Sequence, residues 1–225
     1  MSLRPIVLAS GSPRRRQLLE MLRIPFRVIA PDVDETVLAG EAPSAYVTRL
    51  SRLKAEAVAP HAPGDVILAA DTTVVLEGEI FGKPVSPGDA VTMLSRLQGR
   101  THEVMTAIAV ARDGELAQAL DVSQVTFRPA ERATLEAYVA TGEPLDKAGA
   151  YAIQGLGAPL IERVEGDFFG VMGLPLRLAL DLLAKFGRPY ASPDRPGSSA
   201  TCPSPGWARA SRRAASSSAA GRRAP

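Results

Sequence analysis

The stretch Ile6–Leu19, IVLASGSPRRRQLL, decides the fold. A short apolar run ends in small residues, and the step Ser12-Pro13 then opens a helical pattern with three arginines in its first turn. Serine is a favoured helix N-cap, and proline is a favoured first helical residue. The stretch therefore predicts a strand, a tight turn and a helix, the succession that builds α/β domains.

The three arginines are unexpected at this place, because the N-terminus of a helix already carries partial positive charge. Free backbone N–H groups, the helix dipole and guanidinium groups together form a site for a phosphate or another anion. The strand, turn and helix start therefore predict a phosphate site. A helix start whose arginines are merely solvated is the alternative interpretation.

The chain of 225 residues divides by composition into a folded domain, residues 1–188, and a tail, residues 189–225. The tail is rich in Ser, Ala, Pro, Gly and Arg and has almost no large apolar residues, so we expect it to be disordered. It carries six arginines and one aspartate, whereas residues 1–188 carry 20 basic and 23 acidic side chains. Nucleic-acid binding is therefore not expected of the folded domain. The tail is either an inert extension or a segment that contacts nucleic acid or an acidic surface.

Several classes of protein are excluded by what residues 1–188 lack. The single cysteine, Cys202, lies in the tail, which excludes disulfides, thiolate metal sites and a cysteine nucleophile from the folded domain. No apolar run approaches the length of a membrane span, and no secretory signal precedes the domain. We therefore expect a cytoplasmic protein without a membrane partner.

Apolar runs rich in β-branched residues alternate with helical spacing along residues 1–188. The chain shows no internal repeat and reads as an α/β domain with a mixed sheet between helical layers. Strands are predicted at Pro5–Leu8, Phe26–Ile29, Val66–Leu76, Val104–Ala111 and Val122–Phe127, and helices around Tyr46–Ala57, Met93–Leu97, Leu135–Val139 and Leu176–Leu183.

Asp71 interrupts the strongly apolar run LAADTTVV. A carboxylate there is costly to bury unless it is paired, hydrogen-bonded or bound to a metal. A hairpin across Glu77-Gly78 would bring Asp71 and Lys83 toward one end of the sheet, and lysine binds phosphate as a compact point charge. The alternative is that Asp71 faces solvent at the end of a strand.

Two further charged positions flank the predicted sheet. Lys54 lies beside the apolar stripe of its helix, where a lysine that packs its stem and exposes its amine is the ordinary interpretation. Asp32, Asp34 and Glu35 form an acidic loop after a strand. Such oxygen ligands suit Mg²⁺, which bridges carboxylates to substrate phosphates, although a solvated acidic loop is the alternative.

The segment Thr141–Gly157 contains four glycines and predicts an ordered set of loops. Gln154 offers a donor and an acceptor together, which suits the edge of a nucleobase and would equally suit a structural turn. His102 and His61 do not have the spacing of a metal pair, and a structural, hydrogen-bonded role is expected for His102. The sequence has no nucleophile elbow, no Walker loop and no dinucleotide fingerprint.

Together these motifs resemble the Maf family of nucleoside triphosphate pyrophosphatases. They occur in the order of the family and cover nearly all of residues 5–186. The matching residues are Leu8–Arg15, Asp34-Glu35, Lys54-Ala55, Ala70–Thr72, Gly82–Pro84, His102, Gly142–Pro144, Asp146–Tyr151, Ile153–Gly155 and Gly173–Leu176.

The resemblance implies a single α/β domain related to the inosine triphosphatases, with an elongated mixed sheet, a central cleft and a homodimeric state. It implies cleavage of a nucleoside triphosphate between its α and β phosphates with a divalent cation, Mg²⁺ or Mn²⁺. The segment Asp146–Gly155 is similar to the branch acting on dTTP and UTP. The implied site consists of Asp71 as general base, Glu35 and Asp71 at the metal, Ser10, Arg14, Arg15, Lys54 and Lys83 at the phosphates, and Arg14, Thr72 and Gln154 at the base.

Two alternatives to this function remain open from the sequence. The first is the same reaction on a modified nucleotide. The second is a regulator of cell division that binds nucleotides without hydrolysing them. The presence of Asp71 and Lys83 argues against the regulator, because a sensor needs phosphate-binding cations but no base.

Overall fold

A computed structural model of the chain describes residues 4–190. The predicted tail, residues 189–225, lies outside the described residues except for its first two positions. Within residues 4–190, none of the helices combines the length and the apolar character that crossing a membrane requires.

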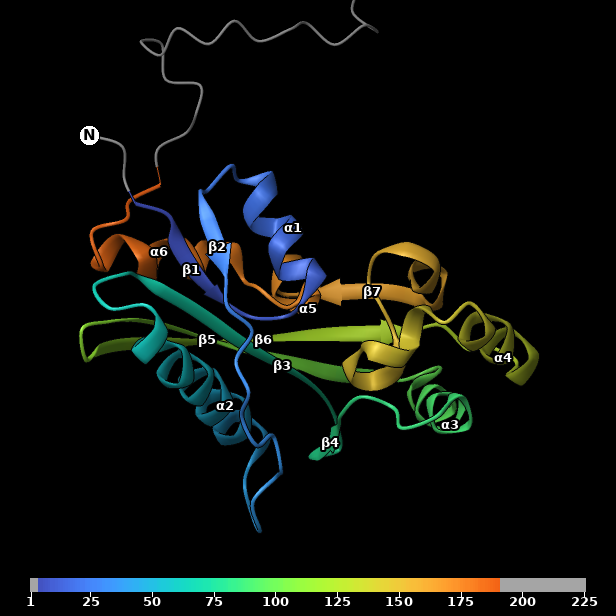
Figure 1. Cartoon of the computed structure of the whole chain (residues 1–225). Helices are drawn as coiled ribbons and strands as arrows, with labels where there is room; N and C mark the ends of the chain where they lie inside the picture. The colour runs from blue at the N-terminus through green and yellow to red at the C-terminus, as the bar shows by residue number, and fades with distance from the viewer. Residues whose placement is uncertain (1–3, 191–225) are drawn as a thin grey trace, which may run out of the picture. The chain divides into compact units, whose positions relative to one another are not determined.

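The fold is α/β with a seven-stranded mixed sheet of order β2-β1-β3-β5-β6-β7, in which β4 pairs only with β3 (Figure 1). β1 pairs in parallel with β2 and β3, and the remaining pairs are antiparallel. The strands are β1 (Ile6–Ala9), β2 (Phe26–Val28), β3 (Ile67–Leu76), β4 (Glu79–Phe81), β5 (Thr101–Arg112), β6 (Glu115–Phe127) and β7 (Ile161–Glu165).

Helices cover both faces of the sheet, as predicted. α2 packs on one face, α1 and α6 on the other, and α3 and α4 lie together at the far end of the sheet (Figure 1). The helices are α1 (Pro13–Met21), α2 (Pro43–Val58), α3 (Pro87–Leu97), α4 (Arg132–Ala140), α5 (Phe168–Met172) and α6 (Leu176–Lys185), with 3-10 helices η1 (Ala59–His61), η2 (Glu143–Asp146), η3 (Ala148–Ala150) and η4 (Gly155–Leu160).

The predicted strands differ from the observed ones mainly at β4, β5, β6 and β7, and β5 begins at Thr101, three residues before the predicted start at Val104. β7, Ile161–Glu165, was not predicted, because it is short and consists largely of charged residues, and the short strand β4 was predicted only through the hairpin across Glu77-Gly78. β6 begins at Glu115 rather than Val122, since its first half, ELAQALD, mixes alanine and leucine with polar residues, lacks β-branched residues and is half-exposed. The predicted loops of residues 141–157 contain η2, η3 and part of η4.

The predicted hairpin across Glu77-Gly78 is confirmed, because β3 and β4 pair antiparallel around it. Both central residues have positive φ, 53° at Glu77 and 82° at Gly78. A two-residue loop of this kind matches the twist of the strands, and glycine adopts the second position without strain. The hairpin places the following loop, with Lys83, beside β3.

The cleft of this fold results from an interruption in strand pairing along one edge of β3. β1 pairs with β3 along Ile67–Ala69, and β4 pairs with it along Val74–Leu76. β5 occupies the opposite edge along Ile67–Val75, so β1 and β4 share one edge. Residues 70–73 have no strand partner on that edge among the described residues. The polar run Asp71–Thr73 lies at this gap.

Candidate active site

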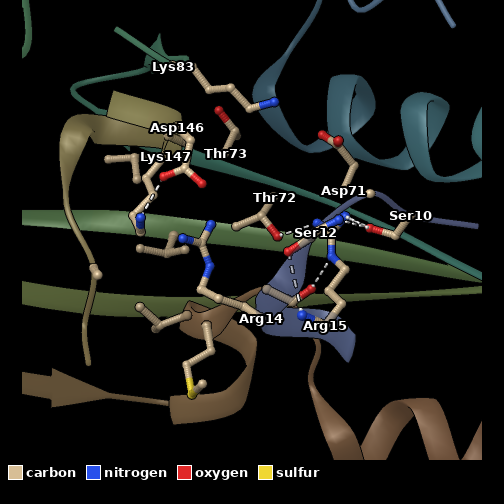
Figure 2. A pocket seen from close by; sticks show the side chains of 18 of the residues that line it. Ser10, Ser12, Arg14, Arg15, Asp71, Thr72, Thr73, Lys83, Asp146 and Lys147 are labelled. Carbon is tan, nitrogen blue, oxygen red and sulfur yellow. Dashed lines mark hydrogen bonds and ion pairs between the residues drawn. The ribbon is translucent and has the colours of Figure 1, made fainter. Parts of the chain in front are cut away.

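A cleft of about 600 Å³ opens at the gap in the pairing of β3 (Figure 2). Its walls come from the turn between β1 and α1, from α2, β3, the loop after β4, and the segments after α4. All nine site residues predicted from the sequence line it, namely Ser10, Arg14, Arg15, Glu35, Lys54, Asp71, Thr72, Lys83 and Gln154.

The turn and helix predicted from Ile6–Leu19 form one wall of the cleft. Ser12 caps α1 by accepting a hydrogen bond from the Arg15 N–H over 3.5 Å, and Pro13 occupies the first turn, which has no acidic residue. The guanidinium of Arg14 is half-buried and extends from this helix start into the cleft (Figure 2). Burial lowers its pKa, and Asp146 opposes that shift. Among residues 4–190, no hydrogen bond or ion pair holds Arg14.

Arg15 differs from Arg14 because its guanidinium is buried and hydrogen-bonded on three sides. It donates from Nε to the Gly173 carbonyl over 2.8 Å, from Nη1 to Ser10 Oγ over 3.2 Å and from Nη2 to Thr72 Oγ1 over 3.1 Å. The Thr72 hydroxyl also lies 2.9 Å from the hydroxyl of Thr106. Arg15 therefore ties α1 to β3 and to the residue that follows α5.

Asp71 and Glu35 converge on the amine of Lys54, which the fold buries. Lys54 Nζ lies 2.5 Å from Asp71 Oδ1 and 2.6 Å from Glu35 Oε1. Asp71 is only 6% exposed. Burial raises its pKa above the ordinary value, and the charges of Lys54 and Arg15 only partly oppose that shift. A general base benefits from such a raised pKa.

Glu35 completes the acidic side of the cleft. Its partial burial raises its pKa, but Lys54, Lys83 and Arg15 more than reverse that shift, so the net pKa is lowered. The neighbouring Asp34 is exposed and accepts a hydrogen bond from the Thr36 N–H over 2.9 Å. Of the acidic loop predicted as a metal ligand set, only Glu35 lines the cleft.

The pair of carboxylates fits a hard divalent cation. Both oxygens point at one cationic group, and carboxylate oxygen is the donor that Mg²⁺ and Mn²⁺ prefer. Within the described part of the chain, no three His, Cys, Asp or Glu side chains gather into a metal site by themselves. Mg²⁺ is commonly held by one or two carboxylates together with substrate phosphates, which agrees with a set of two.

Several lining residues received no role in the sequence-based site. Thr73, on the face of β3 that carries Asp71, is buried, and its hydroxyl has no hydrogen-bond partner among the described residues. Asp146 and Lys147 line the cleft opposite Arg14 (Figure 2). The polar run Asp71-Thr72-Thr73 inside an apolar strand was a signal for Thr73. Only the fold brings Asp146 to the cleft.

His102 is a buried structural residue, as predicted. Its Nε2 lies 2.8 Å from the Tyr151 hydroxyl, and its ring packs edge-on against Phe127 and Tyr151. Nδ1 has no partner among the described residues. Burial lowers the pKa of His102 to about 4.

This lowered pKa makes stability depend on pH. Below pH ~6.5 the unfolded chain binds a proton at His102 that the folded protein binds only near pH 4, so stability falls as the pH falls through this window. We expect the free energy of unfolding to lose about 2 kcal/mol through this residue between pH 7.5 and pH 5. Urea unfolding of the wild type and of His102→Gln at both pH values measures it. Equal pH dependence in both proteins would contradict the prediction.

Comparison with known proteins agrees with this geometry. The family described as Maf-like protein matches residues 5–186. A protein of Myxococcus xanthus is 52% identical over 185 residues, which cover 82% of this chain and 93% of the relative. A protein of Symbiobacterium thermophilum is 46% identical over 184 residues, which cover 82% of this chain and 95% of the relative. Both relatives are named dTTP/UTP pyrophosphatase.

Proposed function

Because this chain belongs to the family of Maf-like proteins, we propose that it hydrolyses dTTP and UTP to the nucleoside monophosphate and pyrophosphate. The observation that carries the proposal is the composition of one cleft. It combines Arg14 at a helix start, whose guanidinium has no partner among residues 4–190, with Lys83 on a tight loop and the buried carboxylate Asp71 at an interrupted strand edge. Phosphate binding and proton abstraction require these groups close together.

The triphosphate would bind along the cationic side of the cleft. Arg14 has no protein partner among the described residues, and Lys83 is exposed beside the carboxylates, so both are available to phosphate oxygens. Lys54 is already paired with Asp71 and Glu35, and its single charge offsets one of the two carboxylates. Ser10 and Arg15 hydrogen-bond to each other and stabilise this side of the cleft. Cations fixed in this way stabilise the charge that spreads over the phosphoryl oxygens during cleavage.

Asp71 would act as the general base. A water molecule attacks the α phosphorus, its proton passes to Asp71, and the bond from the α phosphorus to the bridging oxygen breaks to release pyrophosphate. Lys54 occupies Oδ1 of Asp71, which leaves Oδ2 for the proton. We further propose that Asp71 and Glu35 hold a Mg²⁺ or Mn²⁺ ion, which would supply additional neutralisation of the phosphate charge.

The release of pyrophosphate from a panel of nucleotides tests the function. We expect purified protein with Mg²⁺ or Mn²⁺ to act faster on dTTP and UTP than on CTP, GTP, ITP and 7-methyl-GTP, and to lose activity in EDTA. Release of pyrophosphate only from another nucleotide would support the proposed reaction but contradict dTTP and UTP as its substrates. Nucleotide binding without release would favour the regulator of cell division over the enzyme.

The homodimeric state and the cytoplasmic location implied by the family are part of the proposal. Light scattering on the eluted peak of a gel-filtration column measures the mass of the particle. We expect twice the chain mass of 23.7 kDa. Elution at the mass of one chain would reject the dimer without affecting the proposed reaction.

A further inference from the structure

The backbone on both sides of Gln154 is bound to one pair of side chains, Tyr138 and Glu143. The Glu143 carboxylate accepts hydrogen bonds from the N–H of Leu156 over 3.1 Å and of Gly157 over 2.9 Å. It also accepts one from the Tyr138 hydroxyl over 2.8 Å. One carboxylate therefore joins the end of α4 to the residues that follow Gln154.

The Tyr138 hydroxyl binds the backbone on the N-terminal side of Gln154. It accepts a hydrogen bond from the N–H of Ala152 over 3.1 Å while it donates to Glu143. The bonds reach the chain two residues before Gln154 and two and three residues after it. Tyr138 is 6% exposed, and the bond that it accepts from Ala152 is buried, whereas the bond from Leu156 to Glu143 is exposed.

Two glycines let the loop lie directly against this pair. Gly155 has a φ of +85°, and a Cβ there would lie 2.3 Å from Glu143 Oε1. A Cβ on Gly157 would lie 2.6 Å from both the Ala152 carbonyl oxygen and the Tyr138 hydroxyl oxygen. No larger residue fits at either position without displacing the loop or the pair.

Gln154 itself makes no hydrogen bond through its side-chain oxygen to the described residues, although that oxygen is buried. Its backbone is extended, with φ −101° and ψ 158°, and its side chain lines the cleft. The backbone hydrogen bonds on both sides of Gln154 therefore fix the position of this residue.

We propose that Tyr138 and Glu143 are the positioning pair that holds the amide of Gln154 where it meets the base of the substrate. The inference rests on the proposed function. It adds the residues that fix the loop around Gln154, residues 152–157. Neither Tyr138 nor Glu143 lines the cleft. Their effect on the substrate passes through Gln154, so it should appear in binding and base selectivity rather than in the chemical step.

The test is a double-mutant cycle between Tyr138→Phe and Gln154→Ala. Tyr138→Phe removes one hydroxyl and keeps the buried ring. We expect it to raise the KM for dTTP about tenfold, to change kcat less than about twofold, and to narrow the preference for dTTP over GTP. In the Gln154→Ala background, Tyr138→Phe should change KM and selectivity little further, because the two substitutions act through the same amide.

Glu143→Gln provides a second variant. The amide keeps one acceptor oxygen, which can still accept from Gly157 and Tyr138, but its NH2 group cannot accept the bond from Leu156. A smaller rise in KM is therefore expected. Glu136→Gln is the matched control, because Glu136 is an exposed residue of α4, the helix that carries Tyr138, and the only hydrogen bond or ion pair of its side chain among residues 4–190 is with Arg132. It should leave KM and selectivity unchanged.

The outcomes separate this inference from the proposed function. The dissociation constant of α,β-methylene-dTTP, which is not cleaved between these phosphates, is measured for the same variants. If the wild type does not hydrolyse dTTP, the proposed function fails. The double-mutant cycle is then calculated from the dissociation constants of α,β-methylene-dTTP instead of from KM. Additive effects of Tyr138→Phe and Gln154→Ala, or an equal loss for dTTP and GTP in Tyr138→Phe, would overturn the positioning role.

Discussion

Replacement of Asp71 by asparagine is expected to lower kcat at least a hundredfold and to leave the fold intact. A positioned general base contributes about 10²–10⁴-fold to the rate. Asparagine has the same shape and still accepts a hydrogen bond from Lys54, which lies 2.5 Å from Oδ1, but it cannot take up a proton. Lys54 also keeps its ion pair with Glu35. The loss should therefore appear in turnover rather than in thermal stability.

Steady-state rates of pyrophosphate release and a thermal melt measure the two quantities. Asp181→Asn is the matched control, because Asp181 lies on the exposed side of α6 and, within the described part of the chain, pairs only with Arg177. It should keep the rate of the wild type. A near-normal rate in Asp71→Asn would remove Asp71 from the role of base. A collapsed melting temperature would make Asp71 a structural residue.

The raised pKa of Asp71 adds a pH dependence to this prediction. As the pH falls through that pKa, Asp71 takes up a proton and no longer accepts one from water. The kcat/KM of the wild type should therefore decline at a higher pH than an ordinary aspartate would cause. The residual activity of Asp71→Asn should lack this decline.

The site was predictable where one residue contradicts its local sequence. Asp71 inside an apolar strand and arginines at a helix start both carry an electrostatic cost that only a ligand or a partner offsets. The structure places both in one cleft. The hairpin at Glu77-Gly78 was predictable for a similar reason, because its turn chemistry is local.

The parts that depend on contacts distant in sequence were not predictable. The gap in strand pairing along residues 70–73 arises because β1 and β4 share an edge of β3, and only the folded sheet brings these two strands to the same edge. Tyr138 and Glu143 meet the chain near Gln154 only through the fold of the loop. Each of these residues has an unremarkable local sequence, so no pattern of spacing singles it out.

The three arginines at the start of α1 illustrate this limit most clearly. The helix rotates each successive residue by about 100°, so adjacent side chains face different surroundings. Arg14 points into the cleft, Arg15 is buried under Gly173, and Arg16 is exposed. The family resemblance implies phosphate binding for the first two together. The structure predicts two different consequences of their removal.

We expect Arg14→Ala to raise the KM for dTTP about tenfold or more with little change in melting temperature, because its guanidinium has no partner among residues 4–190. We expect Arg15→Ala to destabilise the protein by about 3 kcal/mol, since three hydrogen bonds are lost, two of them buried and one partly buried. That loss lowers the melting temperature by roughly 6–12 °C in a domain of this size. Calorimetry and steady-state kinetics on both variants measure the contrast. A collapsed melt in Arg14→Ala, or an unchanged one in Arg15→Ala, would reverse the assignment of these neighbours.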